Sequence, residues 1–347
     1  MSDLRALVAD ELARPVDPRV AAMARAVAAT YGQASRAVLF YGSCLRIAPM
    51  EGPSPSPLGL SLSKPCPSSQ GKETASTSSA RAVEQNDPLH GQMLDFYLIV
   101  SDYRAAYGRG WLAPANRLIP PNVFPFTHDD LAAKYAVLSE DDFRRLASSR
   151  TDNVSVWARF AQPARLVWVR DAEARERAEA AVAGAAPALL RAARPLLADR
   201  LSVPELWRDA FALTYAAELR AERGDRAGSV VDADPERYRA FTAPALAAAR
   251  LVADVEADEV AFARPITPAE RRAGVRAWAR RRRRGKALTL LRLTKASGTF
   301  AGGLDYLAWK INRHAAADIA IRPWQRRWPL LGALTLLPRL LARGAVK

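Results

Sequence analysis

Two short stretches of the chain hold residue types that could bind and activate a chain of phosphates. Residues 38–43 form an apolar run that ends abruptly at Gly42 and Ser43. A glycine lets the backbone approach a phosphate closely, and a serine hydroxyl with the amides of a turn can bind phosphate oxygens. Residues 93–100 form a second apolar run, which carries Asp95 near its start. A carboxylate there could hold a divalent metal that bridges the phosphates.

Two strands and a turn are needed to bring these residues together. A strand, a Gly-Ser turn and a second strand with an inward carboxylate are typical of the nucleotidyltransferase fold, which we therefore predict. A charge in so apolar a strand is costly without a partner, and this favours a functional role for Asp95. Many nucleotidyltransferases carry a second carboxylate two residues later, where this chain has Tyr97. We therefore expect the second ligand of a Mg²⁺ ion to come from elsewhere, with Asp102 as the candidate.

The segments that follow predict an α+β chain that becomes helical. We expect strands at 134–138 and 165–169, helices at 103–112 and after Ser139, and a proline-rich loop at 116–124. Lys134 opens the first of these strands and is a candidate catalytic residue in contact with phosphate. It could also be an ordinary solvated lysine.

The patterns divide the chain into three predicted regions. Residues 1–170 form the nucleotidyltransferase domain, 171–262 a helical domain, and 263–347 a basic C-terminal segment of membrane-associating helices. Residues 48–90 are rich in Pro and Ser and lack a hydrophobic period, which predicts a disordered insertion. An ordered lid over the site is the alternative for this insertion.

The positive charge of the chain is concentrated near its C-terminus. The formal net charge is +15, and residues 264–347 hold 20 Lys and Arg residues against 3 Asp and Glu residues. Such a segment favours an anionic partner. Trp324 and Trp328 flank a pair of arginines, as amphipathic rings do at a bilayer interface. The bland alternative is a core helix beside a solvated basic surface.

Other features indicate a peripheral rather than a spanning protein. No apolar run approaches the roughly 18 residues of a spanning helix, and the charged N-terminus does not look like a signal peptide. The two cysteines form neither a metal-ligand pattern nor a disulfide framework, so we expect a reducing compartment. We therefore predict a peripheral protein on the cytoplasmic face of the inner membrane.

Several motifs also occur together in a specific order. They are residues 40–43, 93–96, 134–139 and 157–163, a Gly-Asp-Arg triplet at 224–226, and the segments 293–297 and 300–303. This set resembles the mitochondrial translocator-assembly-and-maintenance type phosphatidate cytidylyltransferases and their bacterial relatives. The resemblance implies an enzyme that forms CDP-diacylglycerol and pyrophosphate from CTP and phosphatidic acid at an anionic membrane surface. Gly42 and Ser43 would then bind the triphosphate. Asp225 and Arg226 are candidates for nucleotide or headgroup contacts, or they close a helical loop.

Two other functions stay open. A nucleotidyltransferase acting on nucleic acid or a small molecule would use the basic tail to hold phosphates. A nucleic-acid partner should place aromatic residues between the basic ones as stacking platforms, whereas the aromatic residues here accompany a leucine-rich stretch, so no nucleic acid is expected. A catalytically decayed membrane adaptor is the other alternative, for which Tyr97 and Cys44 are the best support.

Overall fold

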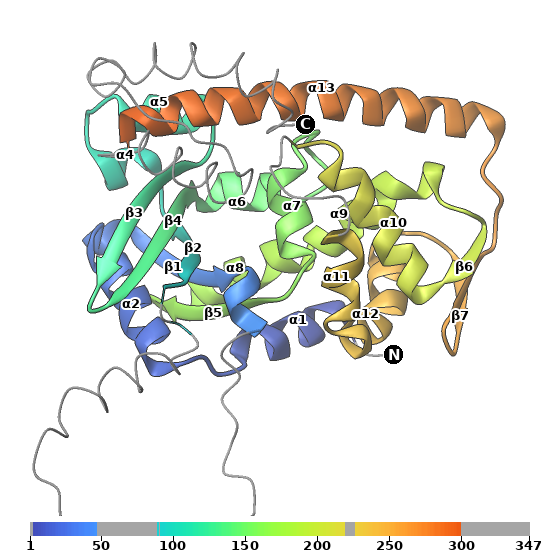
Figure 1. Ribbon diagram of the computed structural model, residues 1–347, viewed down its shortest axis with the longest axis horizontal. Helices are drawn as coiled ribbons and strands as arrows, with labels where there is room; N and C mark the ends of the chain where they lie inside the picture. The colour runs from blue at the N-terminus through green and yellow to red at the C-terminus, as the bar shows by residue number, and fades with distance from the viewer. Residues whose placement is uncertain (1–2, 47–88, 90, 219–225, 300–347) are drawn as a thin grey trace, which may run out of the picture.

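The fold is a mixed sheet flanked by helices, with one long helix lying along an edge of the molecule (Figure 1). The computed structural model describes residues 3–46, 89, 91–218 and 226–299. The predicted insertion at 48–90 and the tryptophans at 324 and 328 therefore lie almost entirely outside the described residues. The α+β class predicted from the sequence is confirmed.

A five-stranded sheet forms the centre, in the order β3-β4-β2-β1-β5. The strand β2 pairs in parallel with β4, while the other pairs are antiparallel. The predicted strands are present and slightly longer than expected, and Asp95 lies on the central strand. The strands are β1 (Ser35–Tyr41), β2 (Met93–Val100), β3 (Asn122–His128), β4 (Leu131–Ser139) and β5 (Ala164–Val169).

Side chains alternate between the two faces of the sheet along each strand. Both faces are buried in the central strands. One face, with Phe40 and Phe96, packs in the same apolar cluster as α2 (Pro18–Ala29) and the start of α4 (Tyr103–Tyr107). The other face, with Tyr41 and Tyr97, joins a larger cluster built mainly from helices. Asp95 lies two residues before Tyr97 and so belongs to this second face.

The helices on the second face carry a small additional sheet. In it, β6 (Arg200–Ser202) pairs with β8 (Glu259–Phe262), which pairs with β7 (Ala253–Glu256). Along the chain these elements follow the order α9, β6, α10, α11, α12 and the β7–β8 hairpin. The helices of the second face are α1 (Leu4–Ala13), α6 (Glu140–Leu146), α7 (Ser155–Phe160), α8 (Ala172–Ala183), α9 (Ala185–Ala193), α10 (Val203–Tyr215), α11 (Arg226–Asp232) and α12 (Pro235–Ala248).

One apolar cluster runs across the boundary predicted near residue 170. It includes Leu4, Leu39, Trp207 and Trp278, which come from α1, the central sheet, α10 and α13 (Pro268–Thr299) respectively. The regions on the two sides of this boundary therefore share a core. Their division into separate domains stays a prediction.

The long helix α13 begins with a cap formed by its own side chains. Thr267 and Glu270 form a reciprocal capping box, and Pro268 occupies the first helical position. Trp278 is fully buried, and its indole lies 6.4 Å from that of Trp157 on α7. Gly285 lets α13 approach α10 closely, because a Cβ at this position would lie 2.0 Å from the carbonyl oxygen of Ala217. The helix is thus fixed against both α7 and the end of α10.

Two predictions of local structure were wrong. The helix expected at 103–112 is two helices, because α4 ends at Gly108, whose φ is +66°, and α5 (Leu112–Leu118) follows. The loop expected at 116–124 contains the end of α5 and the start of β3. The region 171–262 is largely helical, as expected, and also holds the short strands β6, β7 and β8. Among the described residues, none of the helices combines the length and apolar character needed to cross a bilayer.

Candidate active site

The turn after β1 brings Gly42 against the carboxylate of Asp95. Tyr41 lies opposite Asp95 in the antiparallel pair β1–β2, so the next residue turns across the end of that pair. Gly42 has a φ of +98°, a conformation that residues with a Cβ rarely adopt. A Cβ here would also lie 3.1 Å from Asp95 Oδ2. Glycine is therefore favoured at position 42 for two reasons: the positive φ of the backbone and the close approach of the Asp95 carboxylate.

Asp95 and Lys134 form an ion pair on adjacent parallel strands. They are register partners in the β2–β4 pair, and Lys134 Nζ lies 2.9 Å from Asp95 Oδ1. Both side chains are mostly buried, with 20% and 28% of their surface exposed. Asp95 Oδ1 is buried and accepts no aligned hydrogen bond. The two predicted catalytic residues are thus in contact, and the Lys134 ammonium meets Asp95 Oδ1 without an aligned hydrogen bond.

Ser43 and Cys44 follow in a short 3₁₀ turn, η2 (Ser43–Arg46). Ser43 is exposed, while Cys44 is buried and its thiol lies 3.6 Å from the carbonyl oxygen of Met93. Burial, and then the charge of Asp95, raise the pKa of the Cys44 thiol. Cys44 is therefore a packed neutral group beside the site, and Ser43 is the residue of this turn that is free to meet a ligand.

Aromatic side chains occupy the place of the second carboxylate. Tyr97 is 4% exposed, and its ring centroid lies 5.2 Å from those of Tyr41 and Phe160. Burial raises the pKa of Tyr97, which keeps its hydroxyl neutral. The guanidinium of Arg159 lies over the Tyr41 ring, 4.8 Å from its centroid. An aromatic layer, with the Arg159 guanidinium over one of its rings, therefore lies on the same face of the sheet as Asp95.

The C-terminal helix α13 also reaches this face of the sheet. Arg292 donates to the carbonyl oxygen of Pro120 at 2.8 Å and to the hydroxyl of Ser155 at 3.0 Å. Lys295 donates to the carbonyl oxygens of Ile119 and Pro121. No sequence signal singled out Arg159, Arg292 or Lys295 as site residues, although the first lies in the aromatic-basic segment at 157–163 and the last in the segment at 293–297.

Of the remaining predicted residues, Asp102 does not join this group. Asp102 follows the far end of β2 and accepts from the backbone amides of Arg104 and Ala105 as the N-cap of α4. It lies seven positions after Asp95, most of them in an extended strand, which places it roughly 23 Å away, so it cannot share a metal ion with Asp95. Asp225 lies outside the described residues, and Arg226 is the first residue of α11, with its side chain also outside the description.

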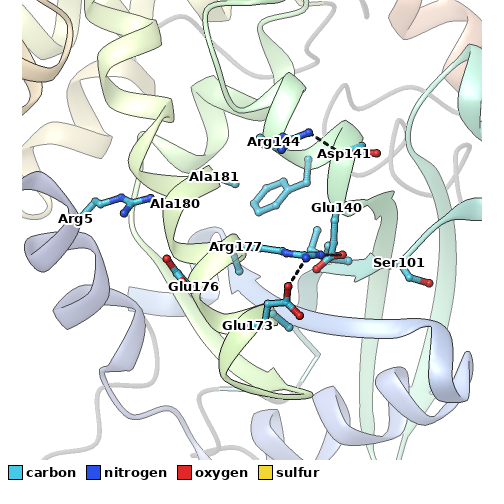
Figure 2. A pocket seen from close by; sticks show the side chains of 14 residues that line it. Arg5, Ser101, Glu140, Asp141, Arg144, Glu173, Glu176, Arg177, Ala180 and Ala181 are labelled. Atoms are coloured by element: carbon cyan, nitrogen blue, oxygen red, sulfur yellow. Dashed lines mark hydrogen bonds and ion pairs between the residues drawn. The ribbon is translucent and has the colours of Figure 1, made fainter.

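An open groove of about 710 Å³ lies at the opposite ends of β2 and β4, beside Ile99 and Glu140 (Figure 2). Most of its charged groups are already paired, with Arg5 and Glu176 as the exceptions. Arg177 binds the carboxylates of Glu140 and Glu173, and Arg144 binds Asp141 at 2.9 Å. The groove therefore presents few unsatisfied groups to a ligand, and it is separate from the site at Asp95.

No protein-family model matches the chain, and a search of the curated proteins finds no match either. The candidate active site consequently rests on its geometry. Four residues define it: Gly42, Ser43, Asp95 and Lys134.

Proposed function

We propose that this protein is a Mg²⁺-dependent nucleotidyltransferase that makes CDP-diacylglycerol and pyrophosphate from CTP and phosphatidic acid. The observation that carries the proposal is the contact of the Gly42 turn with the Asp95–Lys134 pair. A glycine turn, a carboxylate and an ammonium group within one phosphate chain's length are the parts that transfer of a nucleotidyl group requires.

A bound Mg²⁺ fits Asp95 as one of few protein ligands. Carboxylate oxygens suit this ion, which usually takes one or two protein carboxylates and completes its shell with phosphates and water. Asp95 Oδ1 is buried without an aligned hydrogen bond and could serve as that ligand. Among the described residues, no three His, Cys, Asp or Glu side chains gather around a common point. When bound, the ion would neutralise charge on the phosphate chain.

The residues of the chain have simple tasks in this reaction. A phosphate oxygen of phosphatidic acid attacks the α-phosphorus of CTP, and the bond to the pyrophosphate breaks. Gly42 and Ser43 would hold the triphosphate, and Lys134 would move from Asp95 to the phosphate oxygens that gain charge. The attacking phosphate is already ionised near neutral pH, with a second pKa of about 6. No general base is therefore needed.

The basic face of α13 favours a lipid substrate. Helix α13 lies along one side of the molecule (Figure 1), and several of its basic residues are exposed, where they could meet anionic headgroups at about 1 kcal/mol each. The exposed residues are Arg271, Arg272, Arg276, Arg280, Arg283, Arg284 and Lys286.

A nucleic-acid substrate is less well supported. In a winged helix, the last helix before the hairpin is the one that would enter a groove of the nucleic acid. The helix in this position before the β7–β8 hairpin is α12. Its exposed side chains include Glu236 and Arg239, and Arg239 is already paired with Glu236 and Asp258. This face lacks the excess of positive charge that binding to phosphates of a duplex requires.

The test is an assay with radiolabelled CTP, Mg²⁺ and vesicles containing phosphatidic acid. The wild-type protein should form CDP-diacylglycerol, and Asp95→Asn should lower the rate by at least about a hundredfold if Asp95 holds the ion. Arg177→Gln, at the far groove, is the matched control and should retain activity. Product formation by Asp95→Asn at the wild-type rate would refute the assignment.

A further inference from the structure

Two arginines beside the candidate site have buried N–H groups without a partner. Arg159 Nε and Arg292 Nη2 are inaccessible to solvent and make no hydrogen bond. A buried donor that is left unpaired costs about 1 to 3 kcal/mol. Arg159 comes from α7 and Arg292 from α13, so two separate elements direct unsatisfied guanidinium groups toward the same face of the sheet.

The two guanidinium groups share one electrostatic environment. Burial lowers the pKa of Arg292, and the positive charge of Arg159 lowers it further, while Tyr97 and Glu218 act in the opposite direction. Burial lowers the pKa of Arg159, and the negative charges of Glu218 and Asp95 are among the interactions that raise it. Both arginines therefore lie around Tyr97, next to the carboxylate of the proposed metal site.

The described residues of this cluster carry more positive than negative charge. Four side chains are basic, Lys134, Arg159, Arg292 and Lys295, and two are acidic, Asp95 and Glu218. Fully ionised, they leave a surplus of two positive charges, which falls to one when Lys295, whose pKa is lowered by burial to about 7, loses its proton. Like charges in a partly buried site repel one another, and two unused donors of fixed geometry match the oxygens of a phosphate group.

We propose that Arg159 and Arg292 bind a phosphate dianion, and that this dianion is the phosphomonoester of the acceptor lipid. The first part stands on the geometry, and the second rests on the proposed function. The arginines surround Tyr97, which is two residues and roughly 7 Å along β2 from Asp95. A phosphate held there lies beside a nucleotide bound at Gly42 and Asp95, where its oxygen can approach the α-phosphorus.

Lys295 has a supporting position in this site. It lies three residues after Arg292 on α13, and it binds the carbonyl oxygens on both sides of Pro120. Arg292 binds the carbonyl oxygen of Pro120 itself. These contacts fix the segment before β3 against α13, so Lys295 is a positioning residue for Arg292.

The test measures binding of soluble dihexanoyl-phosphatidic acid to the full chain by calorimetry, without CTP. Arg159→Gln and Arg292→Gln should each weaken binding at least about tenfold, as expected for a charge-assisted hydrogen bond. Arg292→Lys should recover only part of the loss, because it lacks the planar fork. Arg177→Gln should bind as the wild type does. Dihexanoyl-phosphatidylcholine, which lacks the dianion, should bind to none of them.

The outcomes separate this inference from the proposed function. Arg159→Gln gives up the cation–π contact with Tyr41 but no hydrogen bond to a described residue, so it is the less disruptive of the two variants and keeps the test informative if Arg292→Gln does not fold. Folded variants that bind phosphatidic acid as the wild type does would overturn the inference. If they lose affinity for CTP instead, the dianion belongs to the nucleotide and the assignment to the acceptor is wrong. Normal arginine-dependent binding without any CDP-diacylglycerol formation would overturn the proposed function alone.

Discussion

Glu11 and Arg237 form a buried ion pair that joins the first helix of the protein to α12. Each side chain is 3% exposed, and the Arg237 guanidinium donates to both carboxylate oxygens of Glu11. A third donor group of Arg237 binds the carbonyl oxygen of Ala161 at 3.1 Å. Residues 226 positions apart in the chain are thus locked together next to the end of α7.

Replacement of Glu11 should strongly destabilise the protein. Glu11→Leu leaves the guanidinium of Arg237 buried without its counter-charge, which costs about 3 to 5 kcal/mol. Urea unfolding followed by circular dichroism measures the change. The double variant Glu11→Leu with Arg237→Met removes both charges and should recover much of the loss. A double variant as unstable as the sum of the two single variants would contradict this account.

A methyl group at Gly42 should impair the site more than the fold. Gly42→Ala forces a residue with a Cβ into a positive φ, at a cost of about 1 to 2 kcal/mol, and pushes against Asp95 Oδ2. Gly32→Ala is the matched control, because Gly32 also has a positive φ (+50°) but open space around it. Thermal unfolding should show similar losses for both variants. Only Gly42→Ala should lose CTP binding in calorimetry, and equal losses in both would count against the site.

Gly285 should be intolerant of alanine although it lies within a helix. In an ordinary helix interior, alanine is more favourable than glycine by about 1 kcal/mol. At Gly285 a Cβ would collide with the backbone carbonyl of Ala217, so Gly285→Ala should instead destabilise the protein. The control is Gly110→Ala, where the nearest atom would be at an ordinary 3.7 Å. A stabilised Gly285→Ala variant in thermal unfolding would show that α13 does not pack here.

Lys295 should make stability depend on pH above neutrality. Burial and then the charge of Arg292 lower the pKa of Lys295 to about 7, against about 10.4 in an unfolded chain. The unfolded state therefore binds more protons between these values, and stability rises with pH across that window. The penalty is fully present below pH 7 and disappears near pH 10. Lys295→Met should flatten this part of the stability profile, and parallel profiles of the two proteins in urea unfolding would refute the assignment.

The sequence predicted the central strands because their apolar runs are long and bounded by clear turn residues. It missed β3, since Pro125 lies within that strand and proline argues against a strand in general. The structure resolves the conflict by placing β3 at the edge of the sheet, where a proline is tolerated. The strands β6, β7 and β8 were missed because three or four residues are too few to establish a period.

The candidate site was only partly predictable for a related reason. Gly42, Ser43, Asp95 and Lys134 lie in or next to strands, so their types and spacing indicate their role. Arg159 and Arg292 lie on helices, and their closeness depends on how α7 and α13 pack on the sheet. Asp102 seemed suitable because it is close to Asp95 in the sequence, but a strand carries it to the opposite end of the sheet.

The position of α13 near the end of the described chain has a consequence for folding during synthesis on the ribosome. The sheet that carries Asp95 can be complete once β5 has been synthesised, but Arg292 arrives more than a hundred residues later. Emerging regions generally fold from the N-terminus onward. A nascent chain would therefore expose the aromatic layer around Tyr97 until α13 is released and docks across it. Such distant contacts also slow folding, so the proposed phosphate chemistry would begin only when nearly all of the described chain has been made.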